Sequence, residues 1–393
     1  MRPILLAAAT PLCLLAACSH EPLCRMQPPS GGAVAAAGTA TSSVSSIRGA
    51  LRPDQLSDKI GERMRARESA VRAMEAGDGS RNILLLSGGG QLGAYGVGVL
   101  NGWTESGKRP TFDVVAGVST GALSATFAFL GPEYDTRLRD LYLNLTQHQV
   151  LRNRSWLSLP FADSLASNEP LKKLIAKEIT IKELRKVREA GENGRSLFVG
   201  AVELKSGQFV AFDLTDIAQM NDEQAALDLF HKCLAASAAI PVVFPPECFA
   251  PFAFADGGTR QNVFLPAVVS ATTRASGAHP TNVYIVLNNW SETAPELGLQ
   301  ANLLQLAGRA TDLLFREAQL GALRRIHDQA AELGYEASIT QLTPSDCQAA
   351  HAACAPSVTV QVCHDYMQCL YDLGHQRAID KEAFTPLEAP AAD

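Results

Sequence analysis

The sequence predicts an α/β protein with a three-layer α/β/α sandwich around a mainly parallel central sheet. Two short apolar runs, Ile83–Leu86 and Val114–Ala116, have the composition of buried strands. A glycine-rich turn follows each run, and helical patterns then cover Leu92–Trp103 and Ser119–Leu130. The order strand, helix, strand, helix with apolar strands is typical of a parallel sheet that helices cover on both faces.

Further elements are expected downstream of this unit. Leu197–Leu204 and Gln208–Phe212 alternate apolar and polar residues on either side of Ser206-Gly207, which predicts a β-hairpin. The remaining expected strands are Phe249–Ala255, Asn282–Leu287, Tyr335–Leu342 and Val358–Val362, and the remaining expected helices are residues 54–76, Asp222–Ala239, Leu303–Leu333 (one helix or a broken pair) and His364–Lys381.

The chain of 393 residues is long enough for one large domain or two. Residues 18–53 are expected to be a flexible tether, because Pro28–Ser46 is rich in Gly, Ala, Ser and Thr. We expect a catalytic domain over residues 54–290 and a helical extension over 291–393. Residues 133–190 are more charged and mostly helical in pattern, which suits a cap over the substrate or a helical pair on the outside.

Charge and hydropathy exclude two kinds of protein. The net charge is −6, and no basic stripe is present that could release counterions from a nucleic acid. A nucleic-acid partner is therefore not expected. No apolar run after residue 20 is long enough to cross a bilayer, so the sequence does not predict a transmembrane helix.

The N-terminus has the pattern of an export signal. Arg2 precedes the apolar stretch Ile4–Ala17, and Leu15-Ala16-Ala17-Cys18 resembles the lipobox of bacterial lipoproteins. This resemblance implies removal of residues 1–17, lipidation of Cys18 and attachment to a membrane of the cell envelope. Ser19 in place of Asp favours the outer membrane. The alternative is an ordinary signal peptide with an accidental cysteine.

Of the nine cysteines, seven follow Cys18. Four of these crowd into the C-terminal region, which in an exported protein predicts one or two disulfides. A zinc site that includes His351 and His364 is the alternative, although no close Cys-x-x-Cys pair is present. Cys233 and Cys248 form another bridge or are core residues, and Cys24 is the candidate for the odd thiol. The four C-terminal cysteines are Cys347, Cys354, Cys363 and Cys369.

A candidate nucleophile lies in the segment Gly117-Val118-Ser119-Thr120-Gly121, which has the Gly-x-Ser-x-Gly pattern of a nucleophile elbow. The turn from strand to helix is so tight that glycine is needed two residues to either side of the serine. The N-terminus of the following helix favours negative charge at the reacting centre. Ser119 is therefore expected to be held out at the edge of the sheet.

A second glycine turn, Gly88-Gly89-Gly90, follows the first strand. Its backbone N–H groups are expected to stabilise the oxyanion of a tetrahedral intermediate, where one donor contributes about 3 kcal/mol. The alternative is a dinucleotide site, because Gly88, Gly90 and Gly93 also fit the Gly-x-Gly-x-x-Gly fingerprint. That site needs an acidic residue after the next strand, whereas Asp113 stands before it.

The serine needs a group that accepts its proton. Asp256 ends the apolar run Phe252–Ala255 and is followed by Gly257-Gly258, which lets the backbone approach other groups. An unperturbed Asp, with a pKa of about 3.9, is a weak base, so Asp256 can act only when desolvated and bonded to the serine. An ordinary Asp-Gly turn is the alternative. The histidines judged less suitable, as surface or core residues, are His231, His279 and His327.

Taken together, Gly88–Gly93, Gly117–Gly121 and Asp256–Gly258 resemble the motifs of the patatin-like phospholipases, in the same order and spacing. Ala235–Pro246 is similar to the family's segment before the aspartate strand, and the resemblance covers about residues 80–290. It implies an α/β/α fold and a Ser–Asp dyad that hydrolyses acyl esters.

By this resemblance, Ser119 is the nucleophile, Asp256 is the base, and the N–H groups of Gly88, Gly89 and Gly90 form the oxyanion hole. Many members carry Arg or Lys where this chain has Leu92, which puts the preference for a phosphate headgroup in doubt. The other motif glycines are Gly93, Gly117, Gly121, Gly257 and Gly258.

The sequence thus predicts a lipid-anchored acyl hydrolase that forms an acyl-enzyme on Ser119, with a membrane phospholipid or lysophospholipid as its substrate. No cofactor or metal is expected, and calcium dependence is not expected either, because no EF-hand-like acidic loop is visible. Two alternatives remain. One is an envelope lipoprotein that uses the fold as a binding scaffold, and the other is a nucleotide-binding enzyme.

Overall fold

The computed structural model describes residues 24, 47–51, 80–155, 162–249, 251–264, 280–292, 303–354, 362–380 and 383–389. The predicted lipobox at Cys18, the tether over Pro28–Ser46 and the helix over 54–76 lie outside the described residues, as do His279 and all but the last residue of the predicted strand Val358–Val362.

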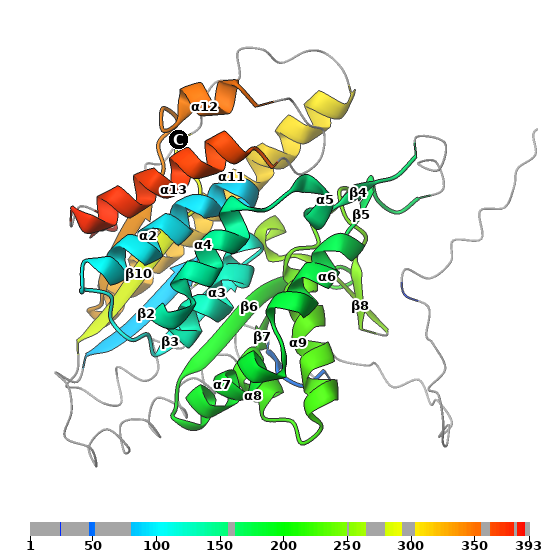
Figure 1. Cartoon of the computed structure of the whole chain (residues 1–393), viewed down its shortest axis with the longest axis horizontal. Helices are drawn as coiled ribbons and strands as arrows, with labels where there is room; N and C mark the ends of the chain where they lie inside the picture. The colour runs from blue at the N-terminus through cyan, green and yellow to red at the C-terminus, as the bar shows by residue number, and fades with distance from the viewer. Residues whose placement is uncertain are drawn as a thin grey trace, which may run out of the picture.

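One twisted sheet forms the centre of the molecule (Figure 1), and its strands follow the order β1-β7-β6-β3-β2-β10-β11-β12. The five inner strands are parallel where they pair, β7 and β12 run antiparallel to their inner neighbours, and β1 pairs antiparallel with β7. The inner strands are β2 (Arg81–Leu86), β3 (Val114–Val118), β6 (Ser196–Glu203), β10 (Thr281–Leu287) and β11 (Glu336–Gln341), and the edge strands are β1 (Ala50–Leu51), β7 (Phe209–Asp213) and β12 (Thr385–Pro386).

Helices cover both faces of this sheet, as predicted. Because side chains alternate along a strand, Leu84 and Leu86 of β2 pack into one core with α2 and α3, whereas Ile83 and Leu85 pack into the other core with α11. The first layer contains α2 (Gly93–Glu105), α3 (Thr120–Leu130), α4 (Asp135–Leu143), α9 (Glu223–Ser237) and α13 (His364–Ile379), and the second contains α11 (Leu303–Leu333).

The region of residues 133–190 is mainly helical, as expected from its pattern. Its helices lie beside α3 and α9 in Figure 1. They are α4, α5 (Gln147–Val150), α6 (Glu169–Glu178) and α7 (Ile181–Glu192), with the short strands β4 (Arg152–Asn153) and β5 (Ala166–Ser167) between them, and α8 (Leu214–Ala218) follows β7.

Two predicted elements differ in detail from the structure. The run expected to be one strand over Phe249–Ala255 is instead a hairpin of β8 (Glu247–Phe249) and β9 (Phe252–Asp256), because Pro251 interrupts the run and cannot donate a ladder hydrogen bond. β9 then pairs antiparallel with β6, which sets Asp256 opposite Ala201. The predicted helix or broken pair over Leu303–Leu333 is one helix.

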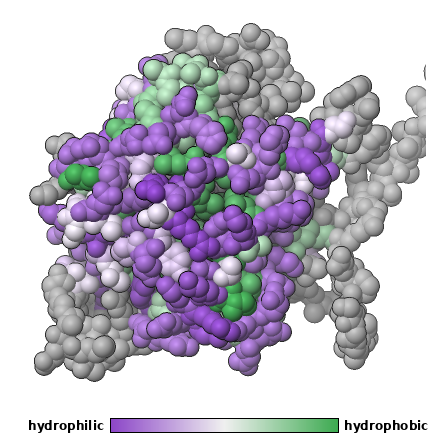
Figure 2. All heavy atoms as spheres, in the orientation of Figure 1, coloured by the Kyte–Doolittle hydropathy of each residue, from purple (hydrophilic) through white to green (hydrophobic). Residues whose placement is uncertain are grey.

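The C-terminal region extends the same sandwich. β11 pairs with β10 along its whole length, and α13 packs against α2. A short helix, α12 (Gln348–Ala352), lies before α13. Among the described helices, none is long and apolar enough to cross a membrane. On the face seen in Figure 2, polar residues predominate and apolar residues lie in small separate areas.

Three disulfides are present in the described part of the chain. Cys347 pairs with Cys369 and Cys354 with Cys363, so both C-terminal pairs are disulfides and the zinc alternative is wrong. The expectation for the odd thiol is also wrong, because Cys24 pairs with Cys248 and ties the N-terminal segment to β8. Cys233 is the free thiol instead, and it is buried in the core on α9.

Thiol labelling checks this pairing. In the native protein we expect Cys233 and Cys24 to resist alkylation, the first because it is buried and the second because it is bonded to Cys248. Unfolding without reductant makes Cys233 accessible to alkylation, whereas Cys24 stays bonded to Cys248. Peptide mapping by mass spectrometry reads out the modified positions, and alkylation of Cys24 before reduction would disprove the Cys24–Cys248 pair.

Candidate active site

Ser119 lies in the turn between β3 and α3, with φ 55° and ψ −124°. Residues other than glycine rarely adopt this backbone conformation, and such strain is common at functional positions. A Cβ atom on Gly117 would lie 2.4 Å from the Gly121 carbonyl oxygen, and one on Gly121 would lie 2.4 Å from the Leu86 oxygen. Only glycine fits at these two positions, so the segment has the backbone of a nucleophile elbow.

A buried hydroxyl holds this turn in place. The N–H of Ser119 donates to Oγ of Ser237 at 3.0 Å, and that hydroxyl in turn donates to the Gly200 carbonyl at 2.6 Å. Ser237 is the last residue of α9 and is fully buried. No local sequence signal points to this role of Ser237, although Ser237 lies within Ala235–Pro246, a segment that is part of the family resemblance.

Asp256, the last residue of β9, lies beside Ser119. The Ser119 hydroxyl donates a hydrogen bond to its carboxyl group, and the Gly258 N–H donates to Oδ1 at 2.7 Å. The backbone N–H of Asp256 donates to the Ala239 carbonyl at 2.8 Å, which fixes the strand end. The structure therefore brings the two residues of the predicted dyad together, although they are far apart in the sequence.

Asp256 is 1 % exposed as a whole residue. Burial disfavours its charged form and raises its pKa to about 7, against the lowering effect of the hydrogen bonds from Ser119 and Gly258. The carboxyl therefore titrates close to neutral pH, where a general base is most effective.

The glycine loop differs in one respect from the expectation. The N–H of Gly88 donates to the Asn262 carbonyl at 3.1 Å and so cannot point into the site. A Cβ atom on Gly88 would lie 3.1 Å from Cβ of Ser119, so this glycine provides close approach and not a donor. Gly89 and Gly90 line the cavity in front of Ser119, and no hydrogen bond within the described residues occupies their N–H groups.

Asn288, the residue after β10, holds the glycine loop through Ser87, the residue after β2. Asn288 donates through its backbone N–H to Oγ of Ser87 at 2.8 Å and through Nδ2 to the Ser87 carbonyl at 2.9 Å. Its Oδ1 accepts from the N–H of Gly96 on α2 at 3.1 Å. No local sequence signal identifies Asn288 or Asn262, because their partners are distant in the chain.

The remaining motif glycines lie around the same centre. Gly93 begins α2, and its Cα faces Thr120 and Tyr142, where a Cβ atom would lie 2.7 Å from Thr120 Oγ1. Gly257 and Gly258 form the turn that follows Asp256.

The dinucleotide alternative does not fit this arrangement. Asp113 lies before β3 and accepts a hydrogen bond from the backbone N–H of Asn82 at 2.8 Å. Because β2 and β3 are parallel, this is the opposite edge of the sheet from the glycine loop. His231 bonds the Ile179 carbonyl and His327 pairs with Asp328, as residues outside the site.

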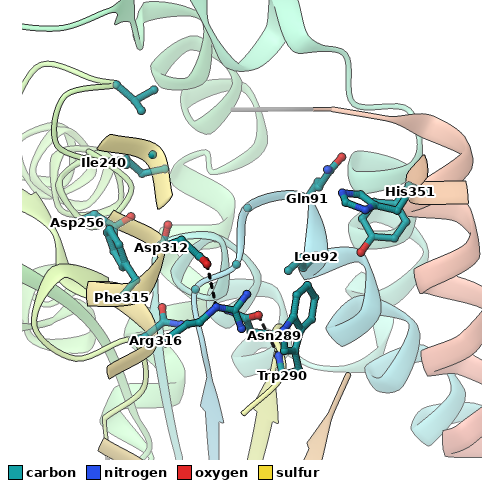
Figure 3. A pocket seen from close by; sticks show the side chains of 18 residues that line it. Gln91, Leu92, Ile240, Asp256, Asn289, Trp290, Asp312, Phe315, Arg316 and His351 are labelled. Atoms are coloured by element: carbon teal, nitrogen blue, oxygen red, sulfur yellow. Dashed lines mark hydrogen bonds and ion pairs between the residues drawn. The ribbon is translucent and has the colours of Figure 1, made fainter. Parts of the chain in front are cut away.

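Two cavities meet at Ser119. The wider one has a volume of about 460 Å³ and is lined by the glycine loop, Asp256, Asn262 and polar residues of the C-terminal region. In Figure 3, His351 lies across this cavity from Asp256, and Arg316 and Trp290 lie at its base. None of these three residues carries a local sequence signal for a role in the site.

The narrower cavity, about 90 Å³, is almost entirely apolar. It shares Ser119, Gly90, Gln91 and Ile240 with the wider one, so both open at the candidate nucleophile. Six of its sixteen lining residues come from the region of residues 133–190. The apolar lining residues are Leu123, Leu141, Leu145, Val150, Leu171, Leu174, Ala238, Phe244, Val362 and Met367.

The buried carboxyl group has a measurable effect on stability. Its pKa is about 7 in the folded state and about 3.9 in the unfolded state, so the folded state binds more protons between these values. Stability should therefore fall by about 1.4 kcal/mol per pH unit as pH rises through this window, and change little above it. We expect Asp256→Asn, which cannot ionise, to unfold at a higher temperature than wild type at pH 8, and the difference in unfolding temperature to be smaller at pH 4. Calorimetry measures the unfolding temperatures, and a difference that does not depend on pH would contradict the raised pKa.

Residues 84–269 match the protein family described as patatin-like phospholipase. Among solved structures, VipD from Legionella pneumophila is similar with a TM-score of 0.38 and 13 % identity, over 80 % of this chain and 69 % of that one. The type III effector ExoU is similar with a TM-score of 0.31 and 13 % identity, over 78 % of this chain and 54 % of that one, so the chain spans about half of its length. No curated protein sequence matches the chain. Residues 84–269 therefore form a domain that is similar to the patatin-like phospholipases, which agrees with the resemblance of the sequence motifs.

Proposed function

We propose that this protein is a lipid acyl hydrolase in which Ser119 attacks an ester carbonyl and Asp256 accepts the serine proton. The observation that carries the proposal is the hydrogen-bonded pair of a strained, cavity-lining serine and a buried carboxyl group whose pKa is about 7. The family match over residues 84–269 supports an enzyme that acts on lipid esters.

The reaction follows from the positions of these groups. As Ser119 Oγ bonds to the carbonyl carbon, its proton moves to Asp256, and the carbonyl oxygen becomes an oxyanion that faces the N–H groups of Gly89 and Gly90. The intermediate collapses when Asp256 returns the proton to the leaving alcohol oxygen, which leaves an acyl group on Ser119. Water then attacks the acyl group with Asp256 as the base again, and a fatty acid leaves.

The two cavities support an assignment of the two halves of the substrate. The narrow apolar cavity suits an acyl chain, since burial of each CH₂ group contributes about 0.8 kcal/mol. The wide cavity has room for the alcohol portion and carries the polar side chains of Asn262, Asp312 and Arg316 among its apolar lining residues. A phospholipid or lysophospholipid has these two parts, and lipidation of Cys18 would keep the enzyme at an envelope membrane, with the outer membrane favoured by Ser19.

Substitution of the dyad tests the proposal. We expect Ser119→Ala to lower kcat/KM for release of fatty acid from short-chain esters at least ~10³-fold, and Asp256→Asn to lower it roughly 10²–10⁴-fold, as loss of a nucleophile and of a general base do. A chromatographic assay of fatty acid measures both. Cys233→Ala is the matched control, since Cys233 is buried outside the site.

Undiminished hydrolysis in both dyad variants would refute the mechanism. Absence of hydrolysis in wild type, together with no labelling of Ser119 by a fluorophosphonate, would favour the scaffold alternative.

The activity should also depend on pH through Asp256. The base must be ionised, so kcat/KM should rise tenfold per pH unit below about pH 7 and level off above it. Initial rates on an uncharged ester between pH 5 and 9 measure this profile. A plateau that extends down to pH 5 would show that the group acts with an ordinary carboxyl pKa.

A further inference from the structure

One wall of the wide cavity comes from α11, which lies outside the segment matched by the family. The residues of α11 that line the cavity are Gly308, Asp312, Phe315 and Arg316. Their spacing places them on one side of the helix, because residues three, four, seven and eight positions apart share a face. This part of the chain therefore completes the candidate active site.

Arg316 is the one Arg or Lys among the described residues that line the wide cavity. The glycine loop brings no charge to this cavity, since its residues beyond the glycines are Gln91 and Leu92. Arg316 is 8 % exposed as a whole residue, so its guanidinium group is fixed within the wall and not free in solvent.

The contacts of Arg316 hold the guanidinium group in one orientation. Nε donates to Oδ2 of Asp312 at 3.0 Å, and the group lies over the ring of Trp290 with 4.7 Å between Cζ and the ring centroid. Figure 3 shows it between these two residues. The fixed orientation lowers the entropy lost when a ligand binds.

The charge of Arg316 is only partly neutralised. Oδ2 of Asp312 also accepts from Nη1 of Arg309 at 2.9 Å, so one carboxylate is shared between two guanidinium groups. Nη1 of Arg316 makes a long contact of 3.4 Å with the Glu292 carbonyl, and Nη2 has no hydrogen-bond partner among the described residues. Arg316 thus keeps both charge and donor capacity.

We propose that Arg316 is a specificity-determining residue that binds an anionic group on the alcohol side of the ester. The inference rests on the proposed function, which places the acyl chain in the narrow cavity and the alcohol portion in the wide one. A guanidinium group matches the geometry of phosphate and carboxylate oxygens. The structure therefore favours esters of a glycerophosphate headgroup over uncharged esters.

A matched pair of substrates tests this inference. Octanoyl glycerol and octanoyl glycerophosphoglycerol, both below their micelle concentrations, differ only in the anionic headgroup. We expect wild type to favour the anionic ester, and Arg316→Gln to lower the ratio of the two kcat/KM values about tenfold, chiefly through KM. Arg316→Lys should give an intermediate ratio, since it keeps the charge without the planar fork.

Arg324→Gln is the control variant, because Arg324 lies on the same helix and pairs with Glu317 but neither contacts Asp312 nor lines the cavity. It should keep the wild-type ratio. An unchanged ratio in both Arg316 variants would overturn the proposal, whereas loss of Ser119 dependence for the uncharged ester would overturn the proposed function instead. If Arg316→Gln does not fold, the wild-type ratio should still fall as salt rises, and a ratio independent of salt would count against Arg316.

Product-like inhibitors separate a lipid headgroup from a free phosphate. We expect glycerophosphoglycerol to inhibit hydrolysis of the uncharged ester by wild type more strongly than inorganic phosphate does, and to inhibit Arg316→Gln less. Stronger inhibition by inorganic phosphate would overturn the assignment to a headgroup.

Discussion

The site depends on one interaction, the hydrogen bond between the Ser119 hydroxyl and the buried carboxyl group of Asp256. Removal of the carboxyl from water makes its ionised form costly, which raises its pKa to about 7. The burial that weakens folding at neutral pH is the condition under which a carboxylate becomes a useful base toward a hydroxyl. A cation placed directly against Asp256 would stabilise its charge and lower its basicity, and the structure instead sets Arg316 against Asp312.

The backbone around this pair is held by groups outside the predicted motifs. Ser237 fixes the elbow, Asn262 accepts from Gly88, and Asn288 braces the loop through Ser87. Gly89 and Gly90 line the cavity, and their N–H groups have no hydrogen-bond partner among the described residues. In the proposed reaction two donors would thus stabilise the oxyanion, where the glycine triplet alone suggested three.

The sequence predicted the order of the elements and the motif positions, because apolar periodicity and glycine turns are local properties. The strands and helices from β2 to α3 were predicted on that basis and are confirmed, whereas the catalytic roles of Ser119 and Asp256 stay predictions. The features that the sequence did not predict depend on contacts between residues that are far apart in the chain. The pairing of Cys24 with Cys248, the hydrogen bond of Gly88 to Asn262 and the place of Arg316 in the cavity follow from tertiary packing. The split of the predicted strand Phe249–Ala255 is different, because Pro251 is a local signal for a break in a strand.

The most direct test of the account is a crystal structure of the protein after reaction with an alkyl fluorophosphonate. We expect phosphorus bonded to Oγ of Ser119, the phosphoryl oxygen within hydrogen-bond distance of the N–H groups of Gly89 and Gly90, and the alkyl chain in the cavity lined by Leu141 and Leu174. An adduct on another residue, or a phosphoryl oxygen that points away from both glycines, would contradict the proposed chemistry.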